Sequence, residues 1–284
     1  MSGAASIHAR LLNGAKLRGE DFNHVFMRYA IERFLYRLSI TPARKTYCLK
    51  GALLFSVWFD APHRPTHDAD FLVLGLENME QIRETMRNIC AIQVNDGMVF
   101  HPSSITIQDI RQNNKYGGYR VQLNCVLGKA RCSLQLDLSF GEAITPAPDE
   151  IVFPTLLSDL LAPNLRVYPR ATVAAEKLEA IVSLGISNSR MKDYFDLSAL
   201  AVEGVLDQSI LAKAIAATFR RRATPFPNGV PIGLSDEFAV DANKKIQWRA
   251  FVNKNQLRAP ELIRIVRQIR EFVMDPLLSA SQSK

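Results

Sequence analysis

Long apolar runs and an export signal are both missing from this sequence. The longest uncharged apolar run, Gly51 to Phe59, is far shorter than the about 18 residues that a membrane-spanning helix requires. The opening segment MSGAASIHAR has no apolar signal core. We therefore expect no membrane association and no export.

Cysteine is scarce, and its spacing excludes CxxC motifs. Without a secretory signal, the four thiols are expected to be reduced core residues of a cytoplasmic protein and not disulfides. They are Cys48, Cys90, Cys125 and Cys132.

Internal repeats and low-complexity tracts are also absent. Apolar residues make up 48% of the chain and charged residues 22%, which excludes a disordered, collagen-like or coiled-coil protein. A chain of 284 residues is long enough for one large domain or two modest ones, at roughly 100–200 residues per domain.

Positive charge is concentrated in the C-terminal third. The whole chain carries a formal charge of +7, whereas the segment 213–270 alone carries twelve basic and four acidic residues. A polyanion is therefore expected to meet this segment first. The alternative is that these charges only cover solvated helix faces.

Hydrophobic periodicity predicts an α+β N-terminal part. Asp21 is expected to cap a helix that continues to Leu38, and Glu77 to Cys90 has helical spacing. Short strands are expected at Tyr47–Leu49 and Asp68–Leu74, with an apolar helical stretch from Gly51 to Phe59 between them. Period-two alternation on both sides of Gly128 predicts an antiparallel hairpin.

After a proline-rich loop, every strong signal is helical. Helices are expected at 172–184, 191–202 and 206–222 and around Trp248 and Ile265. The sequence thus predicts two domains with a boundary near residue 160: residues 1–160 as the α+β domain and 161–284 as a helical one.

Asp68 and Asp70 are the most informative residues. They alternate at the start of a strand, so both carboxylates should lie on one face. Two neighbouring carboxylates repel each other unless a cation lies between them, and their oxygens suit Mg²⁺ bound with substrate phosphates. Lys50 and Gly51, between a strand and a helix, would let a phosphate approach the backbone. A surface turn is the alternative for the acidic pair.

Asp137 is a third acidic candidate, because alternation places it on the face opposite the neighbouring leucines. If the hairpin lies beside the Asp68–Asp70 strand, Asp137 could be a base or a further metal ligand. Otherwise it is a solvent-facing strand residue.

Charged residues also accompany two of the later helices. Asp193 and Asp196, three apart, should share a helix face, and Lys177 on the preceding helix could hold phosphate. A salt bridge between the helices is the alternative.

The segment before Asp68 holds further polar candidates. His63 and His67 superficially suggest a zinc site, but the prolines around them prevent a shared helix face. Arg64 and Thr66 suit a phosphate fork and a loop hydroxyl, although Arg64 could equally tie down its own loop.

In combination, these residues resemble the AbiEii/AbiGii toxin family of nucleotidyltransferases, members of the DNA-polymerase-β-like superfamily. The resemblance rests on YAIERFLYRLS, LKGA followed by RPTHDADF, AEKLEAIVSLG and RMKDYFDL, in that order along the chain. It implies a mixed sheet with flanking helices, followed by a helical domain that contributes Lys177 and Asp193 to the site. It further implies phosphate approach at Gly51 and metal binding by Asp68 and Asp70.

The resemblance also implies a reaction and its partners. An NMP would be transferred from an NTP, with Mg²⁺ or Mn²⁺, to an acceptor such as the 3′ end of tRNA. An antitoxin partner in a toxin–antitoxin or abortive-infection system is implied as well. The basic C-terminal segment fits an RNA acceptor, and we expect its three consecutive arginines to contact RNA: Arg220, Arg221 and Arg222.

Two other functions stay open from the sequence. One is a small-molecule nucleotidyltransferase of the antibiotic-modifying type. The other is a catalytically silent, protein-binding member of the family, which Ala52 favours because the family commonly has Ser or Gly after this glycine.

Overall fold

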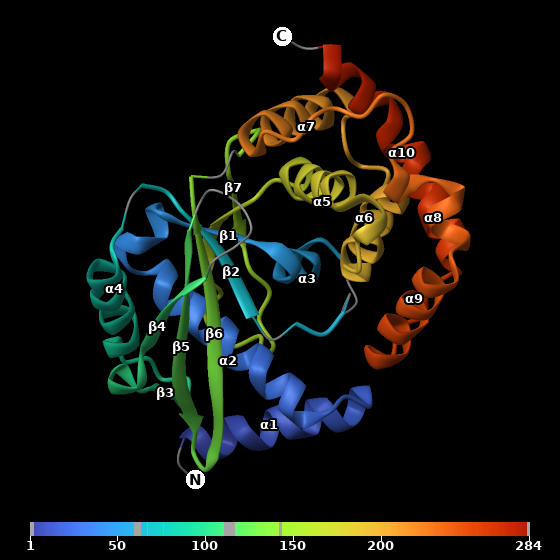
Figure 1. Ribbon diagram of the computed structural model, residues 1–284. Coiled ribbons are helices and arrows are strands. Elements are labelled where there is room, and N and C mark those ends of the chain that lie inside the picture. The colour runs from blue at the N-terminus through green and yellow to red at the C-terminus, as the bar shows by residue number, and fades with distance from the viewer. Residues whose placement is uncertain are drawn as a thin grey trace. The chain divides into compact units, whose positions relative to one another are not determined.

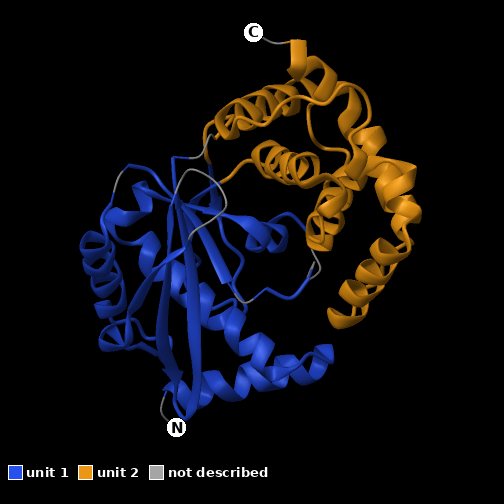
Figure 2. Cartoon of the chain, viewed as in Figure 1, with its two compact units in different colours: residues 1–141, 149–167 blue, residues 142–148, 168–284 orange. Residues whose placement is uncertain are grey.

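The computed structural model describes residues 3–59, 64–66, 68–75, 77–110, 117–141 and 144–282. These residues form two compact units (Figure 2). The first unit comprises residues 1–141 and 149–167, and the second comprises residues 142–148 and 168–284.

The first unit combines one sheet with helices. In chain order its elements are α1 (Gly3–Arg18), α2 (Phe22–Ser39), β1 (Tyr47–Lys50), α3 (Phe55–Trp58), β2 (Asp68–Val73), α4 (Met79–Ala91), β3 (Met98–Phe100), β4 (Thr106–Ile110), β5 (Gly118–Leu127), β6 (Ala130–Phe140), β7 (Asp149–Val152) and β8 (Asn164–Val167). The strands are ordered β3-β5-β6-β2-β1-β8-β7, and β4 also pairs with β5 (Figure 1). The sheet is mixed, because β2 runs parallel to β6 and β1 parallel to β8, whereas the other pairs are antiparallel.

Helix α2 confirms the predicted N-terminal helix. The Asp21 side chain accepts hydrogen bonds from the backbone N–H groups of Asn23 and His24, which caps the first turn. The helix packs against β6 and β8. Its fully buried Arg37 forms an ion pair with the equally buried Asp96, at 2.6 Å and 3.0 Å. This pairing compensates for removing the Arg37 charge from water.

The predicted hairpin is confirmed as β5 and β6. Leu127 pairs with Ala130, and Gly128 in the turn has a φ of +61°, which glycine adopts without steric cost. The alternation is also as expected, since Leu134, Leu136 and Leu138 are buried and Asp137 is not. The hairpin therefore presents a polar face on the side opposite the core.

The first unit extends past the predicted boundary, because β8 pairs with β1 through Leu49 and Val167. A four-residue strand of this kind gives little periodic signal, and β3, β4, β7 and helix α1 were likewise not predicted. The apolar stretch after Lys50 is less regular than expected. It is a 3-10 helix, Gly51–Leu54, followed by the single turn of α3.

The second unit is helical in its described residues, as expected for this part of the chain. Its helices are α5 (Arg170–Leu184), α6 (Met191–Glu203), α7 (Gln208–Arg222), α8 (Asp236–Val240), α9 (Ala242–Lys254) and α10 (Leu262–Gln282). Helix α5 packs against α6 and α7, and α10 packs against both α6 and α7. Within the described ranges, no helix combines the length and apolar character that crossing a bilayer requires.

Candidate active site

Strand β2 carries Asp68 and Asp70 on one face of the sheet. Ala69 and Phe71, which alternate with them, are fully buried, whereas both aspartates are half-buried. Core packing of the alternate residues thus turns both carboxylates away from the core. The expected shared face is present.

Asp70 belongs to a row of charged residues that crosses the sheet. Residues paired across neighbouring strands lie on the same face. The paired positions on β1, β2, β6 and β5 are, in that order, Lys50, Asp70, Asp137 and Arg120. The hairpin therefore lies beside the Asp68–Asp70 strand, which is the arrangement that a role for Asp137 requires, and it brings Asp137 next to Asp70.

Gly51 follows Lys50 in the chain, and the Asp70 side chain leaves no room for a larger residue at this position. Its φ is +77°, a conformation that L side chains rarely adopt. A Cβ at this position would lie 3.0 Å from Cγ of Asp70 and would overlap its Oδ2. Glycine is therefore needed here to leave room for the Asp70 carboxylate, a requirement that the sequence alone did not indicate.

Arg120 is a residue of this face that sequence reasoning missed. Its Nε and Nη2 donate to Oδ1 and Oδ2 of Asp137 at 2.8 Å and 2.7 Å. This hydrogen bonding raises the pKa of Arg120, and the charges of Asp68 and Asp70 act in the same direction. Arg120 and Asp137 are equidistant from the Gly128–Lys129 turn, so counting outward from the predicted turn would have found the pair.

The carboxylate oxygens of Asp68 and Asp70 suit a hard divalent cation, since such oxygens are the ligands that Mg²⁺ prefers. The arrangement of the described residues does not by itself amount to a metal centre. Among them, no group of three or more His, Cys, Asp or Glu residues is placed to hold an ion. Asp68 and Asp70 are thus two candidate ligands, and substrate phosphates would have to supply others.

Two of the predicted nucleotide contacts lie before β2. Arg64 and Thr66 are half-buried, and the Thr66 hydroxyl is 3.5 Å from the backbone oxygen of Asp68. Their proposed phosphate contacts stay predictions. His63 and His67 lie outside the described residues.

The second unit holds the other predicted set, on α5 and α6. Nζ of Lys177 lies 3.2 Å from Oδ1 of Asp193 and 2.7 Å from Oδ2 of Asp196. The side chains are 11%, 2% and 0% exposed, respectively. Arg190 adds a second cation, with Nε 2.6 Å from Asp193. The two aspartates share a helix face as predicted, and the alternative of an interhelical salt bridge is present.

The three consecutive arginines end α7, and they differ in their surroundings. Arg222 is 19% exposed and pairs with Glu179 at 2.6 Å and Glu176 at 3.4 Å, so it joins α7 to α5. Arg220 is exposed and Arg221 is half-exposed. The expected RNA contact is therefore better suited to Arg220 and Arg221 than to Arg222.

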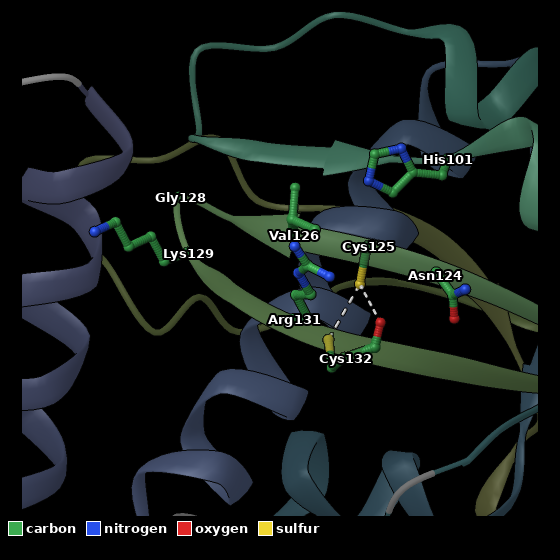
Figure 3. Close-up of a pocket in the computed structure, with 8 residues that line it drawn as sticks. All are labelled: His101, Asn124, Cys125, Val126, Gly128, Lys129, Arg131 and Cys132. Atoms are coloured by element: carbon green, nitrogen blue, oxygen red, sulfur yellow. Dashed lines mark hydrogen bonds between the residues drawn. The ribbon is translucent and has the colours of Figure 1, made fainter.

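A cavity of about 910 Å³ lies at the turn end of the hairpin (Figure 3). Its lining includes His101, Lys129 and Arg131 together with Cys125 and Cys132. The two sulfurs are 3.1 Å apart and both thiols are free. Cys132 is half-exposed, whereas Cys48, Cys90 and Cys125 are buried, so most of the cysteines are core thiols as expected. The hairpin positions of this cavity lie several residues along β5 and β6 from Arg120 and Asp137.

Two solved structures from Helicobacter pylori share this fold. One, described as a nucleotidyltransferase, has a TM-score of 0.51 and 16% identity, over 92% of this chain and 96% of that one. The other, JHP933, has a TM-score of 0.50 and 16% identity, over 92% and 93%. No curated protein matches the sequence. At this identity, the two likenesses show the fold alone.

The chain belongs to the AbiEii family, the nucleotidyl transferase toxins of type IV toxin–antitoxin systems. The family pattern matches residues 33–272, from α2 into α10. This match confirms the resemblance that the sequence motifs suggested. The expected α+β fold with a helical C-terminal region is confirmed as well.

Proposed function

We propose that this nucleotidyltransferase transfers an NMP from an NTP to RNA, such as the 3′ end of tRNA, with Mg²⁺ or Mn²⁺ at Asp68 and Asp70. The observation that carries the proposal is the placement of both carboxylates on one sheet face, beside a glycine that leaves room for one of them. A bound divalent ion would neutralise this pair and draw charge from the phosphates.

The residues around the acidic pair would position the NTP. A phosphate would approach the backbone of Gly51 beside the Asp70 carboxylate, which occupies the place of a Cβ there. Lys50, next to Asp70 in the row, and Arg64 and Thr66 before β2 are the candidate phosphate contacts. The hydroxyl that Ser would provide is lacking at Ala52, so backbone groups would have to carry that contact.

The second unit would supply Lys177 and Asp193. A lysine neutralises phosphate charge as a point charge, and Asp193 with Asp196 keeps its ammonium oriented in the absence of substrate.

Charge supports RNA as the acceptor. The segment from Lys213 to Arg270 has an excess of eight positive charges. Two of its arginines are accessible, since Arg220 is exposed and Arg221 is half-exposed. A small-molecule acceptor requires no such excess. The reaction would take place in the cytoplasm, where NTPs and tRNA occur, and the family suggests an antitoxin as partner.

The test is to incubate the protein with each labelled NTP and Mg²⁺, together with total bacterial RNA in one reaction and with aminoglycoside antibiotics in another. We expect one RNA class to gain label from one NTP, and both Asp68→Asn and Asp70→Asn to lose at least 100-fold in rate while they remain folded. Label on a small molecule, and none on RNA, would instead identify an antibiotic-type enzyme. NTP binding without transfer to any acceptor would support the catalytically silent alternative.

A further inference from the structure

The ion pair between Arg120 and Asp137 argues against Asp137 as a metal ligand. Both carboxylate oxygens of Asp137 accept hydrogen bonds from one guanidinium, in the bidentate geometry that is the strongest arrangement of these groups. A metal ligand must direct an oxygen lone pair at the ion. Each oxygen of Asp137 keeps a second lone pair, but the guanidinium already balances the carboxylate charge and so weakens its attraction for a metal ion.

The Arg120 guanidinium has N–H donors that Asp137 does not use. Nε and Nη2 are engaged by Asp137, and in the described part of the chain no other group accepts from Arg120. The side chain is 38% exposed. Nη1 and the second hydrogen of Nη2 are therefore available to a ligand, while the side chain stays fixed by Asp137.

The position of Arg120 decides which ligand this would be. It stands on the same sheet face as Asp68 and Asp70, one strand beyond Asp137. Two carboxylates with one divalent ion cannot balance the charge of a triphosphate, so a further cation on this face would favour its binding. A guanidinium suits phosphate oxygens because it offers parallel donors in a plane and stays charged at any physiological pH.

We propose that Asp137 is a positioning residue that holds Arg120, and that Arg120 binds the phosphates of the NTP or of the departing pyrophosphate. This inference rests on the proposed metal site at Asp68 and Asp70. It replaces a third carboxylate ligand by a carboxylate-anchored cation, and it gives one face of the sheet both the metal-binding and the phosphate-binding groups.

The experiment uses inorganic tripolyphosphate, which carries no base or sugar, and Mn²⁺ as separate probes. Calorimetry in Mg²⁺ measures tripolyphosphate binding, and electron paramagnetic resonance measures Mn²⁺ binding without phosphate. Arg131→Met is the matched control, because Arg131 is an exposed arginine of the same hairpin that pairs with Val126 near the turn.

Arg120→Met is expected to weaken tripolyphosphate binding at least tenfold, since hydrogen bonds to charged groups are worth about 1.5–3 kcal/mol. Its Mn²⁺ affinity should stay within about threefold of wild type. Asp137→Asn should also retain Mn²⁺ binding within about threefold, and Arg131→Met should change neither affinity. Arg120→Lys, which keeps the charge but loses the fork, should be weakened at least threefold for tripolyphosphate.

Two results would overturn the inference. One is loss of Mn²⁺ binding in Asp137→Asn, which would make Asp137 a metal ligand. The other is wild-type tripolyphosphate binding by Arg120→Met or, if that variant melts below the assay temperature, by Arg120→Lys. Failure of the proposed metal site is recognised separately, because Asp70→Asn would then bind Mn²⁺ as tightly as wild type.

Discussion

Gly51 combines a backbone requirement with a steric one. Its positive φ alone would strain a side chain, and the Asp70 carboxylate fills the place where a Cβ would stand. The second requirement concerns function, because anything that displaces Asp70 disturbs a candidate metal ligand.

Gly51→Ala tests this coupling, with Gly19→Ala as the control. Gly19 also has a positive φ, of +65°, but nothing lies within 4 Å of its would-be Cβ. Gly19→Ala should therefore cost only backbone strain, about 1 kcal/mol of unfolding free energy, and leave transfer unchanged. Gly51→Ala should cost more and should reduce transfer at least tenfold. Urea denaturation and transfer rates measure both, and equal behaviour of the two variants would show that the Asp70 contact is unimportant.

Glu32 gives the first unit a pH-dependent stability. It is buried in α2, accepts a hydrogen bond from the backbone N–H of Leu156 and pairs with Arg33 at 2.7 Å. Burial raises the pKa of Glu32 to about 7, although Arg33 opposes the shift. The folded chain therefore holds a proton between pH 4.5 and 7 that the unfolded chain has released.

The stability that Glu32 contributes is present below pH 4.5 and is lost as the pH rises through 7. Glu32→Gln, which resembles the protonated acid, should lack this loss. Relative to wild type, the variant should thus be more stable at pH 8 than at pH 5 in thermal melting. Melting temperatures that differ by the same amount at both pH values would contradict the raised pKa.

At the scale of elements, Lys177 connects α5 to α6 through two buried carboxylates. Removing the lysine leaves both aspartates without this partner, and breaking a buried ion pair typically costs about 3–5 kcal/mol. A structural and a nucleotide-binding role both predict a defect, so stability and binding must be separated.

Lys177→Met with Asp196→Asn separates them, because the double change removes one cation and one anion. We expect this variant to recover much of the stability that Lys177→Met loses, yet to bind NTP at least tenfold more weakly than wild type. Lys192→Met is the control, since Lys192 is an exposed residue on α6. Calorimetry and melting measure both properties, and recovery of NTP binding along with stability would leave Lys177 a purely structural residue.

The elements that the sequence predicts well are those with a long periodic signal. Helix α2, the hairpin and helices α5 to α7 have such signals, and each lies close to its predicted range. Strands β7 and β8 have four residues each, and they are defined by pairing: β7 with β8, and β8 also with β1. Such long-range pairing leaves no local pattern to detect.

The candidate site likewise has features that the sequence predicts and features that it does not. Alternation alone placed Asp68, Asp70 and Asp137 on their faces, because a strand's period is fixed. The ion pair of Arg120 and the fit of Gly51 against Asp70 depend on which strands become neighbours. Residue roles toward nucleotide, metal and RNA stay predictions, since they depend on ligands as well as on the chain.

At the scale of the whole molecule, the basic C-terminal segment predicts salt-sensitive RNA binding. Replacing Arg220 and Arg221 by Ala should flatten the dependence of log K on log salt by about 1.4, at about 0.7 per phosphate contact for single strands. NTP affinity should not change. The control removes two cations elsewhere, Lys129 and Arg131, and should leave the slope as it is.

Arg222→Ala gives the contrasting result in this test. Because Arg222 pairs with Glu176 and Glu179, its loss should lower the melting temperature more than it changes the salt slope. If all three arginines affect only melting, RNA phosphate is not their partner, and the C-terminal charge would cover solvated helix faces.

The unequal burial of the thiols makes the molecule selectively labelable. Burial raises the pKa of Cys48 and Cys90 to about 12, and Cys125 is buried as well, so a maleimide at pH 7 should attach to Cys132 first. Mass spectrometry should then find one label, and none in Cys132→Ser, whereas a second rapid label would show that a buried thiol opens readily. Because alternation puts Cys132 and Asp137 on opposite faces of β6, a fluorophore at Cys132 would leave the acidic strand face unmodified and would require no engineered cysteine.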